Sequence, residues 1–136
     1  MINKLDEAFR FQQQALNLLS SRQDVLASNI ANADTPGYLA RDIDFSEQLK
    51  NAMNNTAVKS PVTMNATSDR HLAGNAMPFD DPDLLYRIPD QSSADGNTVD
   101  MDQERVSFAD NAMKYQSGLT FMGADIKKMM SVLSQG

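Results

Sequence analysis

Histidine is the side chain most often used for proton transfer near neutral pH, and His71 is the only histidine among the 136 residues. It lies in a stretch rich in Asn, Ser and Thr, and the chain contains no cysteine. A Ser-His-Asp or Cys-His arrangement would therefore rest on one unsupported residue. We expect His71 to be exposed in a loop, and we predict that the chain is not an enzyme.

Three neighbouring carboxylates, Asp80, Asp81 and Asp83, offer the oxygen ligands that a hard cation such as Ca²⁺ prefers. They are flanked and interrupted by Pro78 and Pro82. Asp and Pro in such a cluster are typical of a solvated turn. We expect a turn here and no metal site.

A second acidic stretch, which includes Asp95 and Asp102, faintly resembles a calcium-binding loop. Aligning Gly96 with the glycine at the sixth position of that loop places Gln91 first, where an aspartate is required. The chain also lacks a glycine-rich phosphate loop. We therefore predict no metal, no cofactor and no small-molecule substrate.

The charge balance argues against further classes of partner. The formal net charge is -6, so the chain lacks the basic field that binding to nucleic acid or an anionic membrane requires. Charged residues at 4, 6, 7 and 10 interrupt the N-terminal stretch where a cleaved signal peptide needs an apolar core. No apolar run reaches the roughly 18 residues that cross a bilayer. A soluble or assembled protein is predicted.

Two long helices are predicted to position the remaining residues. Residues 3–33 contain neither proline nor glycine, and apolar residues recur there at helical spacing. Asn3 is a candidate cap for the start of this helix, with Asp6 in its first turn. This stripe comprises Ile2, Leu5, Phe9, Leu16, Leu19, Leu26 and Ile30, with Gln12 and Gln23 as polar interruptions.

The second helix is predicted to begin after Asp100, a good N-cap residue followed by Gln103 at the third helical position. Its apolar stripe again steps by threes and fours to the end of the chain. The members of this stripe are Met101, Arg105, Phe108, Ala112, Tyr115, Leu119, Met122, Ile126, Met129 and Leu133.

Between the helices, residues 34–99 are rich in Asn, Ser, Thr, Asp and Pro. Only residues 48–53 look briefly helical, and residues 40–45 and 84–88 either pair as a small hairpin or lie extended. We therefore predict a mainly α fold. Helices at 1–33 and 100–136 form one core as an antiparallel coiled-coil hairpin, and residues 34–99 form a loop-rich arm.

The apolar stripes are wider than a single seam between two helices needs, so the pattern favours contacts with further helices. A self-contained bundle is the usual interpretation of such stripes, but the middle of the chain supplies no additional amphipathic helices. Dimerisation into a four-helix bundle stays open. The nine methionines fit contacts with several non-equivalent neighbours, because an unbranched thioether side chain adapts its shape.

Residues 26–38 read LASNIANADTPGY, and this segment resembles the N-terminal signature of flagellar rod and hook proteins. Residues 41–45, 96–104 and 111–116 resemble the proximal rod members of that family. The resemblance covers both ends of the chain and its length, whereas residues 51–89 carry no recognised signature. Leu39 departs from the pattern, because many relatives have Lys or Arg after the Gly-Tyr pair.

The resemblance implies a structural subunit of the proximal rod of the bacterial flagellar basal body. It implies export through the flagellar type III apparatus without a cleaved signal, and assembly in the periplasm into a tube that transmits torque. Its partners would be copies of itself, other rod proteins, the rod-to-membrane-ring adaptor and the export apparatus. It also implies that the termini are poorly ordered in the monomer and become helical on assembly.

The residues expected to make the assembly contacts are Leu5, Phe9, Leu16, Leu19, Leu26, Asn29, Ile30, Asn32, Thr35, Pro36, Gly37, Tyr38, Phe108, Tyr115, Leu119, Met122, Ile126 and Met129. Asn29 and Asn32 either bind a neighbouring chain or cap their own helix. Gln12, Gln23 and Arg105 are expected to contact other chains or the arm and so to set the register. The alternative function is a helical adaptor or secretion chaperone that binds another protein's amphipathic helix.

Overall fold

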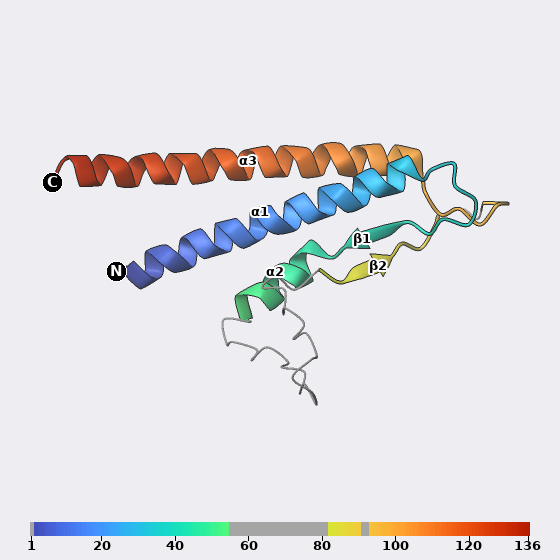
Figure 1. The fold of residues 1–136 in the computed structure, drawn as a ribbon, viewed down its shortest axis with the longest axis horizontal. Coiled ribbons are helices and arrows are strands. Elements are labelled where there is room, and N and C mark those ends of the chain that lie inside the picture. The colour runs from blue at the N-terminus through green and yellow to red at the C-terminus, as the bar shows by residue number, and fades with distance from the viewer. Residues whose placement is uncertain (1, 55–81, 91–92) are drawn as a thin grey trace, which may run out of the picture.

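The computed structural model describes residues 2–54, 82–90 and 93–136, and within them the chain is mainly helical. Two long helices, α1 (Ile2–Ala31) and α3 (Met101–Ser134), run antiparallel, so that both termini lie at the same end of the molecule (Figure 1). Their bounds agree to within two residues with the predicted 1–33 and 100–136. The predicted helical hairpin is confirmed. His71, Asp80, Asp81 and Gln91 lie outside the described residues.

The N-terminal cap that we predicted for α1 is wrong. The helix already includes Ile2, so Asn3 has a helical backbone and cannot take the extended conformation of an N-cap residue. Asp6 consequently lies beyond the first turn. The uninterrupted run of helix-forming residues extends the helix past the polar residue that we expected to begin it.

The start of α3 agrees with the prediction. Asp100 has an extended backbone, with φ -101° and ψ 108°, and its side chain accepts hydrogen bonds from the amides of Asp102 and Gln103. These two bonds measure 3.0 and 3.3 Å. They satisfy two of the amide donors that the first turn of a helix leaves unpaired.

The centre of the α1–α3 interface combines apolar and polar contacts. Leu19 and Leu26 are buried on α1. A Cβ built on Gly118 of α3 would lie 2.9 Å from Leu16 Cδ2, so the missing side chain lets the two helices approach closely. Fully buried Asn111 donates its Nδ2 to the Leu19 carbonyl at 2.8 Å.

The predicted stripe on α3 is wrong at two of its members near its start, whereas Met101 and Phe108 are half-buried as predicted. Arg105 and Ala112 are exposed, whereas Glu104 and Asn111 are fully buried. The prediction followed hydrophobicity, which favours alanine over asparagine at a core position. In the structure Asn111 is the buried residue, because carbonyl and amide groups on α1 accept hydrogen bonds from its side chain.

Gln12 and Gln23 also differ from the prediction, because both bond α3 of the same chain. Gln12 Nε2 donates to Asp125 Oδ2 at 3.0 Å, and Gln23 Oε1 accepts from Asn111 Nδ2 at 2.6 Å. Both glutamines therefore contact α3 within the chain, although the buried Oε1 of Gln12 has no hydrogen-bond partner in the described residues. Arg105 is exposed, and its contact with another chain stays a prediction.

The two helices are closest near the turn and diverge toward the termini (Figure 1). Three predicted seam residues, Leu5, Leu119 and Ile126, are exposed in the single chain. Among the described residues, no helix is both long enough and apolar enough to span a membrane.

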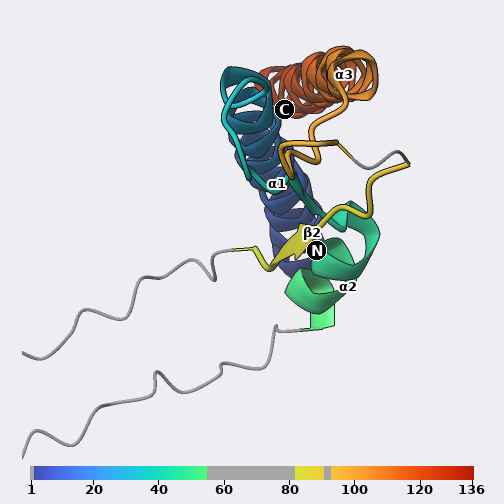
Figure 2. The ribbon, with the colours of Figure 1, turned by 90° about the vertical axis from the view of Figure 1, so that its right-hand side faces the viewer.

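The arm contains a short helix and a two-stranded sheet. Strand β1 (Arg41–Ile43) pairs antiparallel with β2 (Leu84–Tyr86), with Asp42 opposite Leu85. Of the two alternatives for these segments, the hairpin-like pairing is the one observed. Helix α2 (Phe45–Asn54) extends beyond the predicted residues 48–53, because the Asp44 side chain caps it by accepting from the Glu47 amide at 3.1 Å. The sheet and α2 lie beside α1 on the side away from α3 (Figures 1 and 2).

Candidate functional site

The candidate site is the joint at which the C-terminal end of α1, the start of α3 and the two strands meet. The chain leaves α1 through a tight turn in which Asn32 Nδ2 donates to the Ser28 carbonyl at 2.8 Å and Asn32 Oδ1 accepts from Thr35 at 3.1 Å. Gly37 then adopts φ +71°, a conformation that residues with a Cβ rarely take. Asn32 thus caps its own helix, which was one of its two predicted roles.

Asn97, from a distant part of the chain, binds the turn that follows α1. This buried side chain directs its Nδ2 at three carbonyl groups, those of residues 32, 33 and 35, at 3.1, 2.8 and 2.9 Å. Its Oδ1 accepts from the Val99 amide at 2.8 Å. The Asn32 and Thr35 carbonyls also accept bonds from the backbone amides of Thr35 and Tyr38. Asn97 therefore adds a second bond to each of these two carbonyls and donates to the Ala33 carbonyl as well, which ties it to the turn after α1.

The two turns also pair through their backbones. The Gly37 amide donates to the Asp95 carbonyl at 2.9 Å, and the Thr98 amide donates to the Tyr38 carbonyl at 3.0 Å. Gly96 has φ +77°, and a Cβ built on it would lie 3.7 Å from Gly37 Cα. The two signature segments, around residues 35–38 and 96–99, therefore interlock.

Asn29 connects α1 to β1. It is fully buried, and its Nδ2 donates to the Arg41 carbonyl at 2.7 Å and to Glu104 Oε2 at 3.3 Å. Its Oδ1 accepts from the Arg41 amide at 3.1 Å and from the Tyr38 hydroxyl at 3.3 Å. All four hydrogen-bonding positions of this amide are filled within the chain. Asn29 does not cap its own helix, because its side chain pairs with the edge of a strand, and its contact with a neighbouring chain stays a prediction.

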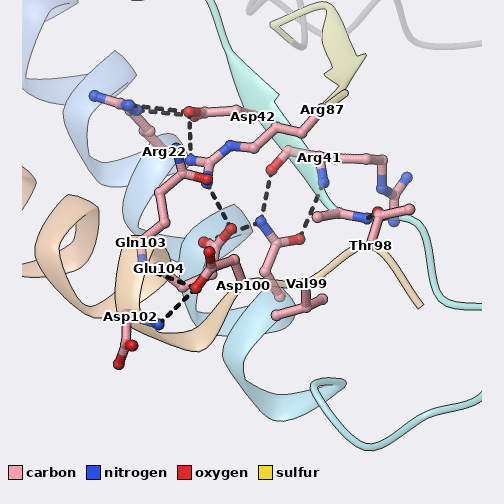
Figure 3. A network of polar contacts seen from close by, with 12 residues as sticks. Arg22, Arg41, Asp42, Arg87, Thr98, Val99, Asp100, Asp102, Gln103 and Glu104 are labelled. Atoms are coloured by element: carbon pink, nitrogen blue, oxygen red, sulfur yellow. Dashed lines mark hydrogen bonds and ion pairs between the residues drawn. The ribbon is translucent and has the colours of Figure 1, made fainter. Parts of the chain in front are cut away.

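A chain of charged residues links four elements of the joint (Figure 3). Arg22 of α1 makes a two-pronged ion pair with Asp42 of β1, at 2.9 and 3.0 Å. Arg87, just after β2, bonds Asp42 at 2.7 Å and Glu104 of α3 at 2.6 Å. Two-pronged arginine–carboxylate pairs fix orientation as well as charge. The network therefore holds the strands against both helices.

Burial and pairing shift the pKa values of these groups in different directions. Burial alone would raise the pKa of Asp42, but hydrogen bonds from Arg22 and Arg87 outweigh it and hold that pKa below its usual 3.8. For Glu104 burial dominates, so its pKa is raised above the usual 4.5 despite the hydrogen bond from Asn29 and the charge of Arg87. The hydrogen bond to Asp42 raises the pKa of Arg22.

The charged side chains of the joint are paired with one another. Its carboxylates are occupied by arginine and asparagine side chains of the same chain. Among the described residues, no group of three or more His, Cys, Asp or Glu side chains is placed to hold a metal ion. Asp83 is exposed, beside β2. The contacts fix the direction in which α3 and the arm leave α1.

Comparison with known proteins identifies the family. A family model described as "Flagella basal body rod protein" matches residues 9–38, which contain most of α1 and the turn through Tyr38. The flagellar basal body rod protein FlgB of Yersinia enterocolitica is 59% identical over 137 positions that cover 100% of both chains. The chain belongs to the FlgB family of flagellar basal body rod proteins. FlgB of Salmonella typhimurium is 56% identical and FlgB of Escherichia coli 55%, each over 100% of this chain and 99% of the relative.

Membership of the FlgB family makes this chain a structural protein of the basal body rod and not an enzyme, as predicted. The alternative of an adaptor or secretion chaperone is not supported. The interlocked turns contain the residues that carried the resemblance. Asn32, Gly37 and Tyr38 meet the segment around Asn97, and Asn29 binds Arg41 and Glu104, all within one chain, so the signature has a structural role inside the subunit.

The predicted assembly residues fall into three groups by location. Nine are buried or half-buried on the helices: Phe9, Leu16, Leu19, Leu26, Ile30, Phe108, Tyr115, Met122 and Met129. Three are exposed on the helices: Leu5, Leu119 and Ile126. Six lie at the joint: Asn29, Asn32, Thr35, Pro36, Gly37 and Tyr38. Their contacts with other subunits stay a prediction.

The residues that sequence reasoning missed are the charged network and Asn97. The network is Arg22, Asp42, Arg87 and Glu104. One signal was available, because Glu104 and Asn111 lie seven residues apart, at the spacing of one helix face. Nothing local in the sequence indicates which arginine meets which carboxylate.

Proposed function

We propose that this FlgB-family chain is a subunit of the proximal rod. It packs its long helices against copies of itself and against other rod proteins, and the resulting tube transmits torque. The chain would act in the periplasm as part of the basal body. The joint would keep each subunit's arm and helices in a fixed relation while load passes through the tube.

The observation that carries this proposal is the apolar surface that α1 leaves uncovered on α3. Val106, Met113 and Phe121 are 70%, 71% and 69% exposed along this one helix. Exposed apolar surface of this extent is typical of a protein that buries it against a partner. Long antiparallel helices with apolar flanks are suited to packing side by side in a tube.

The same proposal extends to the finer partners. The chain would bind other rod proteins, the rod-to-membrane-ring adaptor and the flagellar export apparatus, and it would be exported without a cleaved signal. The helices would form one core and residues 34–99 an arm, tied together at the joint.

The experiment starts from a normally motile strain from which the FlgB gene has been deleted, and tests whether this chain complements the deletion. The wild-type chain should restore swimming and be recovered in purified basal bodies. Leu119→Asp should abolish both, because Leu119 is already partly exposed in the single chain and a charge in a dry interface is costly. The matched control Leu119→Met keeps size and polarity and should swim.

Circular dichroism of the purified variants separates assembly from folding, since both should keep the helical content of the wild type. Normal swimming by Leu119→Asp would show that this face of α3 is not an interface. Absence of the wild-type chain from basal bodies would overturn the proposed function itself.

A further inference from the structure

The two outer edges of the small sheet in the arm differ in whether their backbone groups are hydrogen-bonded. In an antiparallel pair, alternate residues direct their backbone groups toward the partner strand and away from it. Arg87 donates its amide to the Ala40 carbonyl at 2.9 Å, and Arg41 directs its own groups toward Asn29. With Arg41 opposite Tyr86, residues 84 and 86 must therefore point their amides and carbonyls away from β1.

The outer edge of β1 is closed. The side-chain amide of Asn29 donates to the Arg41 carbonyl and accepts from the Arg41 amide, as a paired strand would. The outward amide of Ile43 donates to Asp42 Oδ1 at 2.8 Å. Side chains of the joint thus bind the amide and carbonyl of Arg41 and the amide of Ile43 on this edge.

The outer edge of β2 is open. In the part of the chain that the structure describes, the outward amides and carbonyls of Leu84 and Tyr86 have no hydrogen-bond partner. The side chains there are also uncovered, since Tyr86 is 67% and Ile88 93% exposed. Proteins usually protect such an edge with charge, a bulge or a covering element, because an open apolar edge recruits another strand.

We infer that the outer edge of β2 binds an extended segment of a neighbouring rod subunit, which adds a third strand to the sheet. This inference rests on the proposed rod function. Strand addition derives its affinity from main-chain hydrogen bonds and its specificity from alternate side chains. The partner segment therefore pairs with the outward groups of Leu84 and Tyr86 and places apolar side chains beside Tyr86 and Ile88.

Charge distinguishes this partner from a second β2. Asp83 directly precedes β2 and Asp90 follows the strand by four residues, and both are exposed. Pairing β2 with β2 of another copy would bring four carboxylates to one small sheet, in a chain whose net charge is already -6. The partner segment is accordingly basic at its ends, and it comes from a different part of the neighbouring subunit.

The test is photo-crosslinking in assembled basal bodies. p-Benzoylphenylalanine replaces Tyr86, a conservative change of one exposed aromatic for another, in cells that lack their own FlgB gene. The matched control carries the same photoreactive residue at Met113 on α3, which is comparably exposed. Mass spectrometry of the adducts should map the Tyr86 crosslink to an extended segment of another rod subunit with basic residues at its ends.

Three results would overturn the inference. If the residue at 113 yields adducts with rod proteins and that at 86 yields none, the edge is unused although the proposed function stands. A crosslink from residue 86 to β2 of a second copy, or to a helix, would show that the inferred partner segment is wrong. If the protein is absent from basal bodies, the proposed function fails together with the inference.

A pair of substitutions tests whether the backbone makes the contact. Tyr86→Pro deletes an amide that points away from β1, so the pairing with β1 is retained, whereas Tyr86→Ala deletes the side chain and keeps the amide. We expect Tyr86→Pro to reduce incorporation into basal bodies at least tenfold and Tyr86→Ala to have a much smaller effect. Equal incorporation of the two variants would show that the outward amide makes no contact.

Discussion

Asn29 of α1 and Glu104 of α3 are both fully buried, and Asn29 Nδ2 donates a hydrogen bond of 3.3 Å to Glu104 Oε2. Asn29 also holds the backbone of β1 at Arg41, and Glu104 also holds Arg87 beside β2. This pair is thus the point at which the two long helices and both strands come together. A substitution at either residue should therefore weaken the contacts of both helices and both strands at the joint.

Asn29→Asp should be among the most damaging single substitutions. It removes the two donated hydrogen bonds and places a second carboxylate beside Glu104. We expect the free energy of unfolding to fall by about 3–5 kcal/mol, as for other unpaired buried charges. Urea titration monitored by circular dichroism measures this loss, which should narrow at low pH because one of the two carboxylates then takes up a proton.

Asn32→Asp is the matched control, since Asn32 is only partly buried and donates one hydrogen bond, to the Ser28 carbonyl. Its cost should be about 1 kcal/mol. Similar losses for the two variants would contradict the central position assigned to Asn29.

Asp42→Asn should reveal how the charged network depends on pH. The folded protein holds the pKa of Asp42 below 3.8, so the carboxylate contributes stability above that pH and loses it as the pH falls through the folded pKa. At pH 6.5 the variant should be less stable than the wild type by about 2–3 kcal/mol. Denaturant titrations at a series of pH values should show this difference shrinking below about pH 3.8.

Glu104 acts in the opposite sense, because its raised pKa favours folding below pH 4.5 and this contribution is lost as the pH rises through the folded pKa. The charge of Asp42 contributes to the raised pKa of Glu104, so the difference between the wild type and Asp42→Asn contains the Asp42 contribution together with a change at Glu104. Asp6→Asn, at an exposed position of α1, changes the charge equally and should leave a nearly constant difference. If the difference in unfolding free energy between the wild type and Asp42→Asn also stayed constant with pH, the role of the ion pairs would be contradicted.

The helices and the joint differ in how well the sequence predicts them. The spacing of apolar residues, the absence of proline and the cap at Asp100 predict both long helices to within two residues. These signals are local, since each depends on residues within a turn or two of one another. The strand pairing was foreseen only as one of two alternatives, because β1 and β2 are three residues long and far apart in the sequence.

The polar contacts of the joint could not be predicted in the same way. Asn97 reaches the end of α1 from 62 to 65 residues away, and Asn29 meets Glu104 across 75 residues. Asparagine at such positions resembles any loop or cap asparagine in the sequence. Glu104 lies three residues after the start of α3, where a carboxylate is also favourable in an exposed first turn, and only the folded chain shows that it is buried beside Arg87.

Two glycines inside α3 provide a matched pair of stability tests. Glycine in a helix interior costs about 1 kcal/mol relative to alanine. A Cβ added at Gly123 would meet nothing within 4 Å, whereas one added at Gly118 would lie 2.9 Å from Leu16 Cδ2. We expect Gly123→Ala to raise the free energy of unfolding by about 0.5–1 kcal/mol.

Gly118→Ala should raise the free energy of unfolding by less than Gly123→Ala does, or lower it, since Leu16 must move out of its place in the interface. Thermal unfolding of the two variants, side by side, measures the difference. Equal stabilisation would mean that α1 does not approach α3 closely at Gly118.

Hydrogen exchange should show a gradient of stability along the helical hairpin. The helices are held together near the joint by buried Leu19, Leu26 and Asn111, and they diverge toward the termini (Figure 1). Amides with few buried neighbours open at low free energy even when they are helical. In the isolated subunit we expect residues 19–31 and 104–118 to be the best protected, with protection falling toward residue 4 and beyond residue 125.

Assembly should remove this gradient. Neighbouring subunits would cover the exposed apolar residues near the termini, and binding stabilises the folded state of whatever it covers. Exchange measured on purified basal bodies should therefore show strong protection at residues 4–12 and 125–134 as well. Uniform protection already present in the isolated subunit would mean that the terminal helices are rigid before assembly, and the coupling of their folding to rod formation would have to be abandoned.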